Sequence, residues 1–310
     1  PRKVDRDTVF HLAKLGFNRM SIGIQDFNLE VQIAVNRIQS VEETRLVIDA
    51  AREAGFKSVS VDLIYGLPHQ TLDSIKPTID TVLSLDPDRI ALYHYAHLPH
   101  LFKPQRRIDT SAVPNSEEKL DILQYAVNTL TERGHVFIGM DHFAKPNDEL
   151  AIALREGRLQ RNFQGYSTYA DCDLVAVGVS SIGKIGSTYS QNERDIERYY
   201  AALDEGRLPL MRGYQLNQDD LLRRNIIQDL MCRFGLNFSD YDSQLNTSFR
   251  QYFQEELLDL AQLTELGLLS LEADCLTVTP KGRFLIRNIA MVFDNHLRHK
   301  ETHAQYSKTV

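Results

Sequence analysis

Apolar and polar residues alternate in short segments through the first half of the chain, and the clearest segment is 57–68 (KSVSVDLIYGLP). Val59, Val61 and Leu63 are separated by polar residues, which is the period of a β-strand with one apolar face. Asp62 is unusual because it places a carboxylate in the middle of this strand. Burying it unpaired would cost several kcal/mol. The segment therefore predicts a strand that ends beside water, a cation or a ligand.

A unit of helix, turn and strand is repeated along the first half of the chain. Before segment 57–68, a capping box at Ser40 and Glu43 begins a helical stripe that Gly55 ends. Such units predict a parallel sheet with right-handed crossovers and with its chemistry at the carboxyl ends of the strands. The predicted strands are centred near Ile22, Val61, Leu92 and Ile138.

Several candidate functional residues follow these predicted strands. Gln25 is compatible with a ligand contact and with a structural amide. Arg37 is either a solvated surface charge or a fork for a carboxylate. Ala96 is small enough to let a backbone approach a ligand closely. His94, His97 and His100 point to different sides at their spacing, which disfavours a metal site.

The fourth predicted strand is followed by Asp141 and His142. A carboxylate next to an imidazole is compatible with acid–base chemistry, and equally with a helix cap. Residues 158–168 mix polar and aromatic side chains without a clear period and predict a ligand-binding loop. A fifth strand over 173–180 leads into a glycine-rich turn, where Ile182 is a candidate apolar contact to a flat ligand.

The pattern changes near residue 215. Helices are predicted over 219–234 and 249–266, then two short strands over 268–271 and 276–279, and a last helix from Pro280. This order resembles a winged-helix module. The acidic residues of the second helix argue against DNA binding. The chain therefore divides into two predicted domains, 1–214 and 215–310.

Composition narrows the class of protein. The 310 residues are 43% hydrophobic and 25% charged, with a net charge of −7 at pH 7. These values fit an ordinary globular protein and disfavour a nucleic-acid binder. The cysteines, Cys172, Cys232 and Cys275, form no closely spaced pair, so structural thiols in a reducing compartment are expected. We find no membrane span or signal peptide, and the cytoplasm is the default location.

The chain begins at Pro1, and its five predicted strands are too few for a closed eight-stranded barrel. We therefore expect a fragment that lacks its first helix-strand units.

Six motifs in order resemble the family of bacterial oxygen-independent coproporphyrinogen III oxidases, which are radical S-adenosylmethionine (SAM) enzymes. They are GFNRMSIGIQDFN, VDLIYGLPHQT, YHYAHLP, FIGMDHFAKPNDELA, LQRNFQGYST and TPKGRFLIRNIAMVFD, and the resemblance covers essentially the whole chain. It implies an α/β fold, a partial (βα)6-type barrel followed by a mostly helical, winged-helix-like domain.

The resemblance also implies cofactors. A [4Fe-4S] cluster would be held by a CxxxCxxC motif expected N-terminal to Pro1, so no residue of this chain is a predicted metal ligand. By matched position, the predicted SAM contacts are Gln25, Arg37, Asp62, Ala96 and Ile182. No catalytic residue is singled out.

The implied reaction is reductive cleavage of SAM to a radical that removes hydrogen from a propionate. Two rounds convert coproporphyrinogen III into protoporphyrinogen IX. Arg161 is the leading candidate for binding a propionate, with Arg283 and Arg287 behind it. Besides this substrate, we expect an electron donor as partner, no nucleic acid, and a monomer. The fragment alone is expected to be inactive.

Two other classes of function remain open. A haem-binding chaperone of the same family typically carries His-Asn-x-x-Tyr-Trp where this chain has residues 161–166 (RNFQGY), and the chain contains no Trp. A winged-helix nucleic-acid binder is the other alternative.

Overall fold

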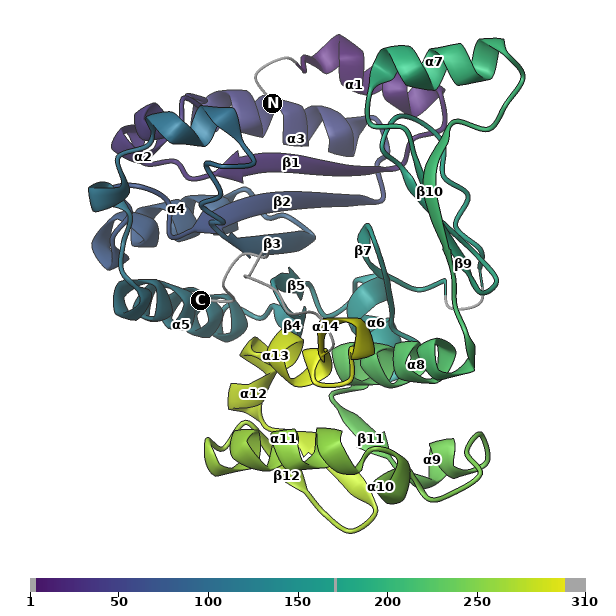
Figure 1. Ribbon diagram of the computed structural model, residues 1–310. Coiled ribbons are helices and arrows are strands. Elements are labelled where there is room, and N and C mark those ends of the chain that lie inside the picture. The colour runs from purple at the N-terminus through teal and green to yellow at the C-terminus, as the bar shows by residue number, and fades with distance from the viewer. Residues whose placement is uncertain (1–3, 170–171, 299–310) are drawn as a thin grey trace. The chain divides into compact units, whose positions relative to one another are not determined.

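The computed structural model describes residues 4–169 and 172–298. These form two compact units that divide after residue 152 (Figure 1).

A five-stranded sheet lies at the centre of the first unit, in the order β1-β2-β3-β5-β4. β1, β2 and β3 are parallel, whereas β5 runs antiparallel to both of its neighbours. The strands are β1 (Arg19–Gln25), β2 (Ser58–Tyr65), β3 (Arg89–His94), β4 (Val136–Gly139) and β5 (His142–Ala144). All four strand centres predicted from the sequence are confirmed.

Helices pack against the apolar face of this sheet. Its core joins Ile22, Val61 and Leu92 of the strands to residues of α1, α3, α4 and α5. The predicted capping box at Ser40 and Glu43 is present at the start of α3. The helices are α1 (Arg6–Lys14), α2 (Leu29–Ala34), α3 (Val41–Glu53), α4 (Leu72–Ser84), α5 (Ser116–Glu132) and α6 (Glu149–Arg155), with 3-10 turns η1 (Lys103–Arg107) and η2 (Thr110–Ala112).

The prediction of an entirely parallel sheet is wrong at its last strands. Gly139 and Met140 both have positive φ, 147° and 49°, so the chain turns sharply after β4 and returns as β5. β5 then lies between β3 and β4. Asp141 and His142 therefore belong to a hairpin turn and its second strand, and not to the mouth of a parallel strand.

The second unit begins with antiparallel structure. The predicted loop 158–168 is instead a hairpin of β6 (Gln160–Asn162) and β7 (Gly165–Ser167).

The predicted strand over 173–180 is also wrong. Gly178 and Ser180 have positive φ, 101° and 61°, which breaks an extended chain, and only Leu174 forms an isolated bridge, to Lys184. A three-stranded sheet in the order β10-β9-β8 follows. Helix α7 connects β9 to β10. The elements are β8 (Ile182–Ile185), β9 (Thr188–Asn192), α7 (Ile196–Asp204) and β10 (Leu210–Gln215).

The remainder of the second unit has the predicted order of helices and hairpin. The two strands of the predicted hairpin, β12 and β13, form a sheet with a third strand, β11, that the sequence did not reveal. The order of this sheet is β11-β13-β12. The predicted helix 249–266 is two helices, because Phe253 (φ −100°, ψ 33°) leaves helical geometry and is fully buried. The elements are α8 (Gln218–Arg233), β11 (Gly235–Asn237), α9 (Ser239–Asp242), α10 (Phe249–Tyr252), α11 (Gln254–Glu265), β12 (Leu269–Leu271), β13 (Cys275–Val278), α12 (Pro280–Phe284), α13 (Ile286–Met291) and α14 (Asn295–Arg298).

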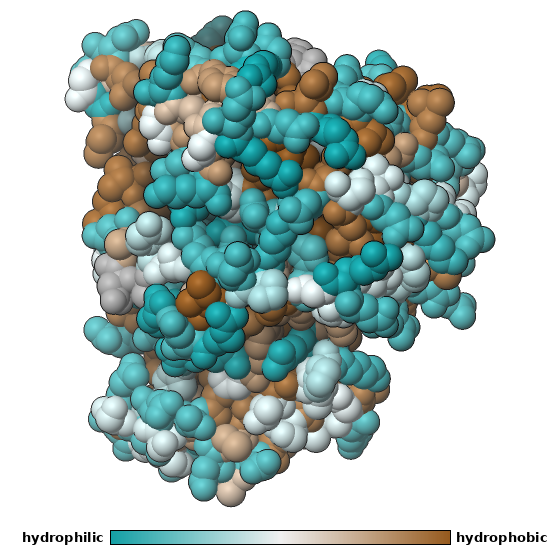
Figure 2. Space-filling model, turned by 180° about the vertical axis from the view of Figure 1, so that it is seen from behind, coloured by the Kyte–Doolittle hydropathy of each residue, from teal (hydrophilic) through white to brown (hydrophobic). Residues whose placement is uncertain are grey.

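The surface is mixed in character. Figure 2 shows apolar residues reaching the surface among hydrophilic ones on the face seen from behind. Independently of that view, Ile196 and Tyr200 of α7 are more than half exposed, at 58% and 56%. Within the described residues, no helix has both the length and the apolar character needed to cross a bilayer.

Candidate functional site

The candidate site lies on the face of the first unit's sheet opposite its apolar core. Gly23 of β1, Asp62 of β2 and Ala91 of β3 are paired in one row of the sheet. Paired residues in neighbouring strands project to the same face. Since Val61 and Leu63 pack into the core, Asp62 projects to the other side. The mid-strand carboxylate predicted to face water, a cation or a ligand is thus on the polar face.

Asp62 is half-buried, and its charge is incompletely stabilised. The Ser21 hydroxyl lies 3.1 Å from each of its carboxylate oxygens and can donate to one of them at a time. Burial raises the pKa of the Asp62 carboxyl above its usual value, although the Ser21 hydrogen bond and the charge of Arg37 both lower it. A ligand that brings a cation or a hydrogen-bond donor would stabilise the ionised form.

Gln25 and Arg37 lie beside Asp62, over Gly23. An Arg37 Nη2 donates to the Gly23 carbonyl oxygen over 2.9 Å. A Cβ at position 23 would stand only 2.5 Å from Gln25 Nε2 and 2.8 Å from Arg37 Nη2, so a larger residue here would displace both side chains from their present positions. Gln25 has a positive φ of 69°, and the register with β2 shifts between Gly23 and Gln25. The structure therefore brings together three of the predicted site residues.

Ala96 follows β3 in a loop that the Gln105 side chain helps to stabilise. Gln105 of η1 donates to the Ala96 carbonyl over 2.9 Å and accepts from the Leu98 N–H over 2.6 Å. The Tyr95 N–H donates to the Tyr65 carbonyl at the end of β2. Since β1, β2 and β3 are parallel, Ala96 lies at the same edge of the sheet as Gln25.

A buried polar network lies beneath this edge of the sheet. Asp26 is 1% exposed, and its carboxylate accepts from Thr78 Oγ1 over 2.5 Å and from Gln70 Nε2 over 2.6 Å. Gln70 also accepts from the Gly66 N–H over 2.6 Å. The network thus joins the loop after β1 to the turn after β2. Only the position of Asp26 directly after a strand could have drawn attention to it.

Two buried glutamines extend the network toward the row of Gly23. Gln32 donates to the Asp26 carbonyl and exchanges hydrogen bonds with Gln39. Gln39 in turn donates to the Gly23 carbonyl over 3.2 Å. In the sequence these amides look like exposed helix and loop residues, so periodicity gave no signal.

The other predicted contacts belong to the second unit. Ile182 begins β8 and is half-buried, opposite Gln191 of β9. Arg161 pairs with Tyr166 across the β6–β7 hairpin, its guanidinium carbon 5.7 Å from the Tyr166 ring centre. Arg283 lies 4.5 Å from the ring centre of Phe234, and Arg287 is exposed.

A [4Fe-4S] cluster does not fit the residues that the structure describes. The described residues contain no group of three or more His, Cys, Asp or Glu side chains that could hold a metal ion. Cluster ligation requires thiolates, but burial raises the pKa of Cys232 to about 12. SAM fits better, since Asp62, Gln25 and Arg37 offer an acceptor and two donors around a glycine floor.

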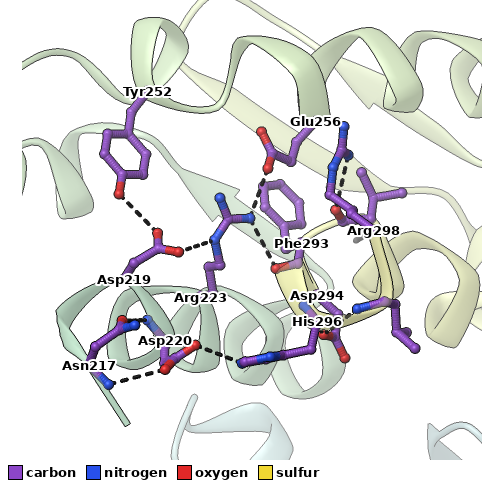
Figure 3. A network of polar contacts seen from close by, with 12 residues as sticks. Asn217, Asp219, Asp220, Arg223, Tyr252, Glu256, Phe293, Asp294, His296 and Arg298 are labelled. Carbon is purple, nitrogen blue, oxygen red and sulfur yellow. Dashed lines mark hydrogen bonds and ion pairs between the residues drawn. The ribbon is translucent and has the colours of Figure 1, made fainter. Parts of the chain in front are cut away.

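The second unit contains a polar pocket of about 320 Å³ that includes Arg223, Glu256 and Arg298 in its lining. Figure 3 shows that these charges already face partners within the chain. Arg223 pairs with Asp219 and Glu256, each over 2.8 Å, and Arg298 pairs with Asp259 over 2.6 Å. We therefore assign this pocket a structural role.

Two family models match the chain, one described as the radical SAM superfamily over residues 1–82 and one as the HemN C-terminal domain over residues 216–285. The oxygen-independent coproporphyrinogen III oxidase of Pseudomonas aeruginosa is 50% identical over 297 residues, which cover 96% of this chain and 65% of that protein. The protein of the same name from Thermostichus vulcanus is 48% identical over 301 residues, which cover 97% of this chain and 93% of that protein.

A solved structure of the coproporphyrinogen III oxidase from Escherichia coli, described as a radical SAM enzyme, superimposes with a TM-score of 0.92. It is 48% identical in sequence, and the match covers 96% of this chain and 68% of that one. The chain thus spans about two thirds of the length of the Pseudomonas and Escherichia proteins.

Proposed function

Because the chain belongs to the oxygen-independent coproporphyrinogen III oxidase family, we propose that it supplies SAM-binding and substrate-binding residues for the oxidative decarboxylation of coproporphyrinogen III. In this reaction two propionate side chains become vinyl groups and protoporphyrinogen IX is formed. Family membership confirms the predicted resemblance and the predicted α/β fold class.

The observation that carries the proposal is the cluster of Asp62, Gln25 and Arg37 over Gly23. Asp62 accepts hydrogen bonds from the ammonium or hydroxyl groups of SAM. Arg37 and Gln25 donate hydrogen bonds to the carboxylate of SAM. Ala96 contributes a close backbone contact and Ile182 an apolar one. SAM, when bound, supplies the group that removes a hydrogen atom from the propionate.

Arg161 is proposed to bind a propionate of the substrate. Its Nε atom is buried and has no hydrogen-bond partner among the described residues. Its backbone is fixed by Gln228 of α8, whose amide, in the orientation that satisfies both groups, accepts from the Arg161 N–H over 2.6 Å and donates to its carbonyl over 3.1 Å. A guanidinium on a fixed backbone is suited to a carboxylate.

The proposal also includes a [4Fe-4S] cluster, whose ligands this chain does not provide, an electron donor, a monomeric state and a cytoplasmic location. A haem-chaperone role is less favoured, because Arg161 and Gly165 stand where the chaperones typically have His and Tyr.

The test uses a chimera in which this chain replaces the matching part of the Escherichia coli relative. The chimera should support anaerobic growth of a strain that lacks its own oxidase. Asp62→Asn should weaken SAM binding by about 1.5 to 3 kcal/mol, the contribution of a hydrogen bond to a charged group, as measured by calorimetry.

The matched control is Asp73→Asn, an exposed carboxylate in the first turn of α4, which should leave SAM affinity unchanged. If Asp62→Asn and the unmodified chimera bind SAM with equal affinity, Asp62 has a structural role and does not contact SAM. Failure of the unmodified chimera to make protoporphyrinogen IX would overturn the proposed function.

A further inference from the structure

The row that contains Asp62 continues across the sheet to His142. Ala91 of β3 is paired with His142 of β5, which is paired in turn with Gly139 of β4. The full row is therefore Gly23, Asp62, Ala91, His142 and Gly139. Its side chains project to one face, and only Asp62 and His142 are larger than a methyl group.

The geometry separates these two side chains by one strand. Neighbouring strands lie about 4.8 Å apart, so the Cα atoms of Asp62 and His142 are roughly 10 Å apart, with the Ala91 methyl between them. Both side chains are half-buried. The row thus presents an acceptor and an imidazole above a floor of small residues.

His142 is held in place from two directions. Its ring meets that of Tyr93 edge to face, with centres 5.9 Å apart, and Tyr93 lies on the same face of β3 as Ala91. The Leu92 N–H donates to the carbonyl of the preceding Asp141 over 2.7 Å. A ring fixed in this way can present a nitrogen to a ligand above Ala91 at low entropic cost.

We propose that His142 binds a propionate carboxylate of the tetrapyrrole substrate. This inference rests on the proposed function. A propionate avoids the Asp62 carboxylate because like charges repel, whereas imidazole is a hydrogen-bond donor to carboxylate. Cationic groups of SAM favour Asp62 for the opposite reason. The row therefore assigns SAM to one end and a substrate carboxylate to the other.

The test measures binding of coproporphyrin III, the stable oxidised form of the substrate, to the full chain by quenching of porphyrin fluorescence. His142→Phe keeps a ring against Tyr93 and removes the donor, and should weaken binding at least about tenfold. His142→Gln keeps a donor and should weaken binding less than about threefold. His11→Phe, at an exposed histidine of α1, should change nothing.

SAM affinity in the chimera should be the same in all of these variants, since Asp62 is intact. Should His142→Phe not fold, as judged by circular dichroism, His142→Ala removes the donor without adding volume and takes its place. Strong binding by the Phe or Ala variant, or weaker binding by Gln than by Phe, would overturn the inference. If the unmodified chain binds no coproporphyrin III, the inference about His142 fails, whereas the proposed function fails only if the unmodified chimera makes no protoporphyrinogen IX.

Discussion

At the scale of single residues, Asp62 combines a functional position with a cost to the fold. Burial raises its pKa, and the Ser21 hydrogen bond and Arg37 only partly offset this effect. A carboxylate whose pKa is higher in the folded state destabilises the fold while it is ionised. Such strain is characteristic of ligand-binding positions.

Asp62→Asn should therefore stabilise the chain at pH 7 while it weakens SAM binding. The gain follows from removing an ionised carboxyl whose pKa is raised by burial. The penalty from wild-type Asp62 is fully present above its folded pKa and disappears below its unfolded value of about 4. The advantage of the Asn variant should thus shrink as the pH falls from 7 to 4, measured by urea unfolding. A variant that is less stable than wild type at pH 7 would contradict this account.

The site residues differed in how far the sequence could reveal them. Asp62 was identified because a carboxylate is unusual in the middle of a strand that has an apolar face. Asp26, Gln32, Gln39 and Gln70 were not, because their partners lie up to 52 positions away in the sequence and periodicity records only local spacing. His142 was noticed as a possible acid or base, but its pairing with Ala91 depended on β5, which the pattern did not show.

At the scale of elements, the sequence predicted those whose burial is regular. The helices over 116–132 and 219–234 and the strand near Val61 each have a buried face at the spacing of their element. The prediction of a strand over 173–180 failed because its alternating apolar residues are not buried. Val175 and Val177 alternate like strand residues, yet they are 69% and 82% exposed. The short strands β5 and β11 have too few residues to show a period.

The ion pairs between α8 and α11 provide a prediction at this scale (Figure 3). The Arg223 and Glu256 side chains are only 11% and 6% exposed. Arg223→Met should destabilise the chain by about 3 kcal/mol, because it leaves Glu256 buried without its cation. Adding Glu256→Met should recover most of this loss. Both changes in the free energy of unfolding are measured by denaturant titration.

The matched control for this pair is Arg207→Met. Arg207 pairs with Glu205, but both side chains are about 60% exposed, so the loss should stay below roughly 1 kcal/mol. An equal loss in Arg207→Met and Arg223→Met would show that burial of the Arg223 pair does not determine its contribution. A double variant no more stable than Arg223→Met would show that the carboxylate was not the source of the cost.

At the scale of the whole molecule, the winged-helix-like order of the C-terminal region raises the question of nucleic-acid binding. Binding of this kind depends mainly on cations that neutralise phosphates. The chain has 35 Lys and Arg against 42 Asp and Glu. In the region from α8 onward, Arg223 and Arg298 are paired with carboxylates, and Arg250 donates to the carbonyls of Ala273 and Glu272. The first turn of α11 contains Glu255 and Glu256, opposite in charge to a recognition helix.

We therefore predict that the chain does not bind random-sequence duplex DNA. In a gel-shift assay at low salt (50 mM), where phosphate contacts are strongest, the duplex should remain free even at about 100 μM protein, the upper end of the usual Kd range for non-specific binding. Glu265→Lys, at an exposed carboxylate of α11, would test whether the acidic helix is the cause. It leaves intact Glu256, which pairs with Arg223, and Glu255 and Asp259, which pair with Arg298. A wild-type shift that weakens steeply as salt rises would contradict the prediction and restore a nucleic-acid role for this region.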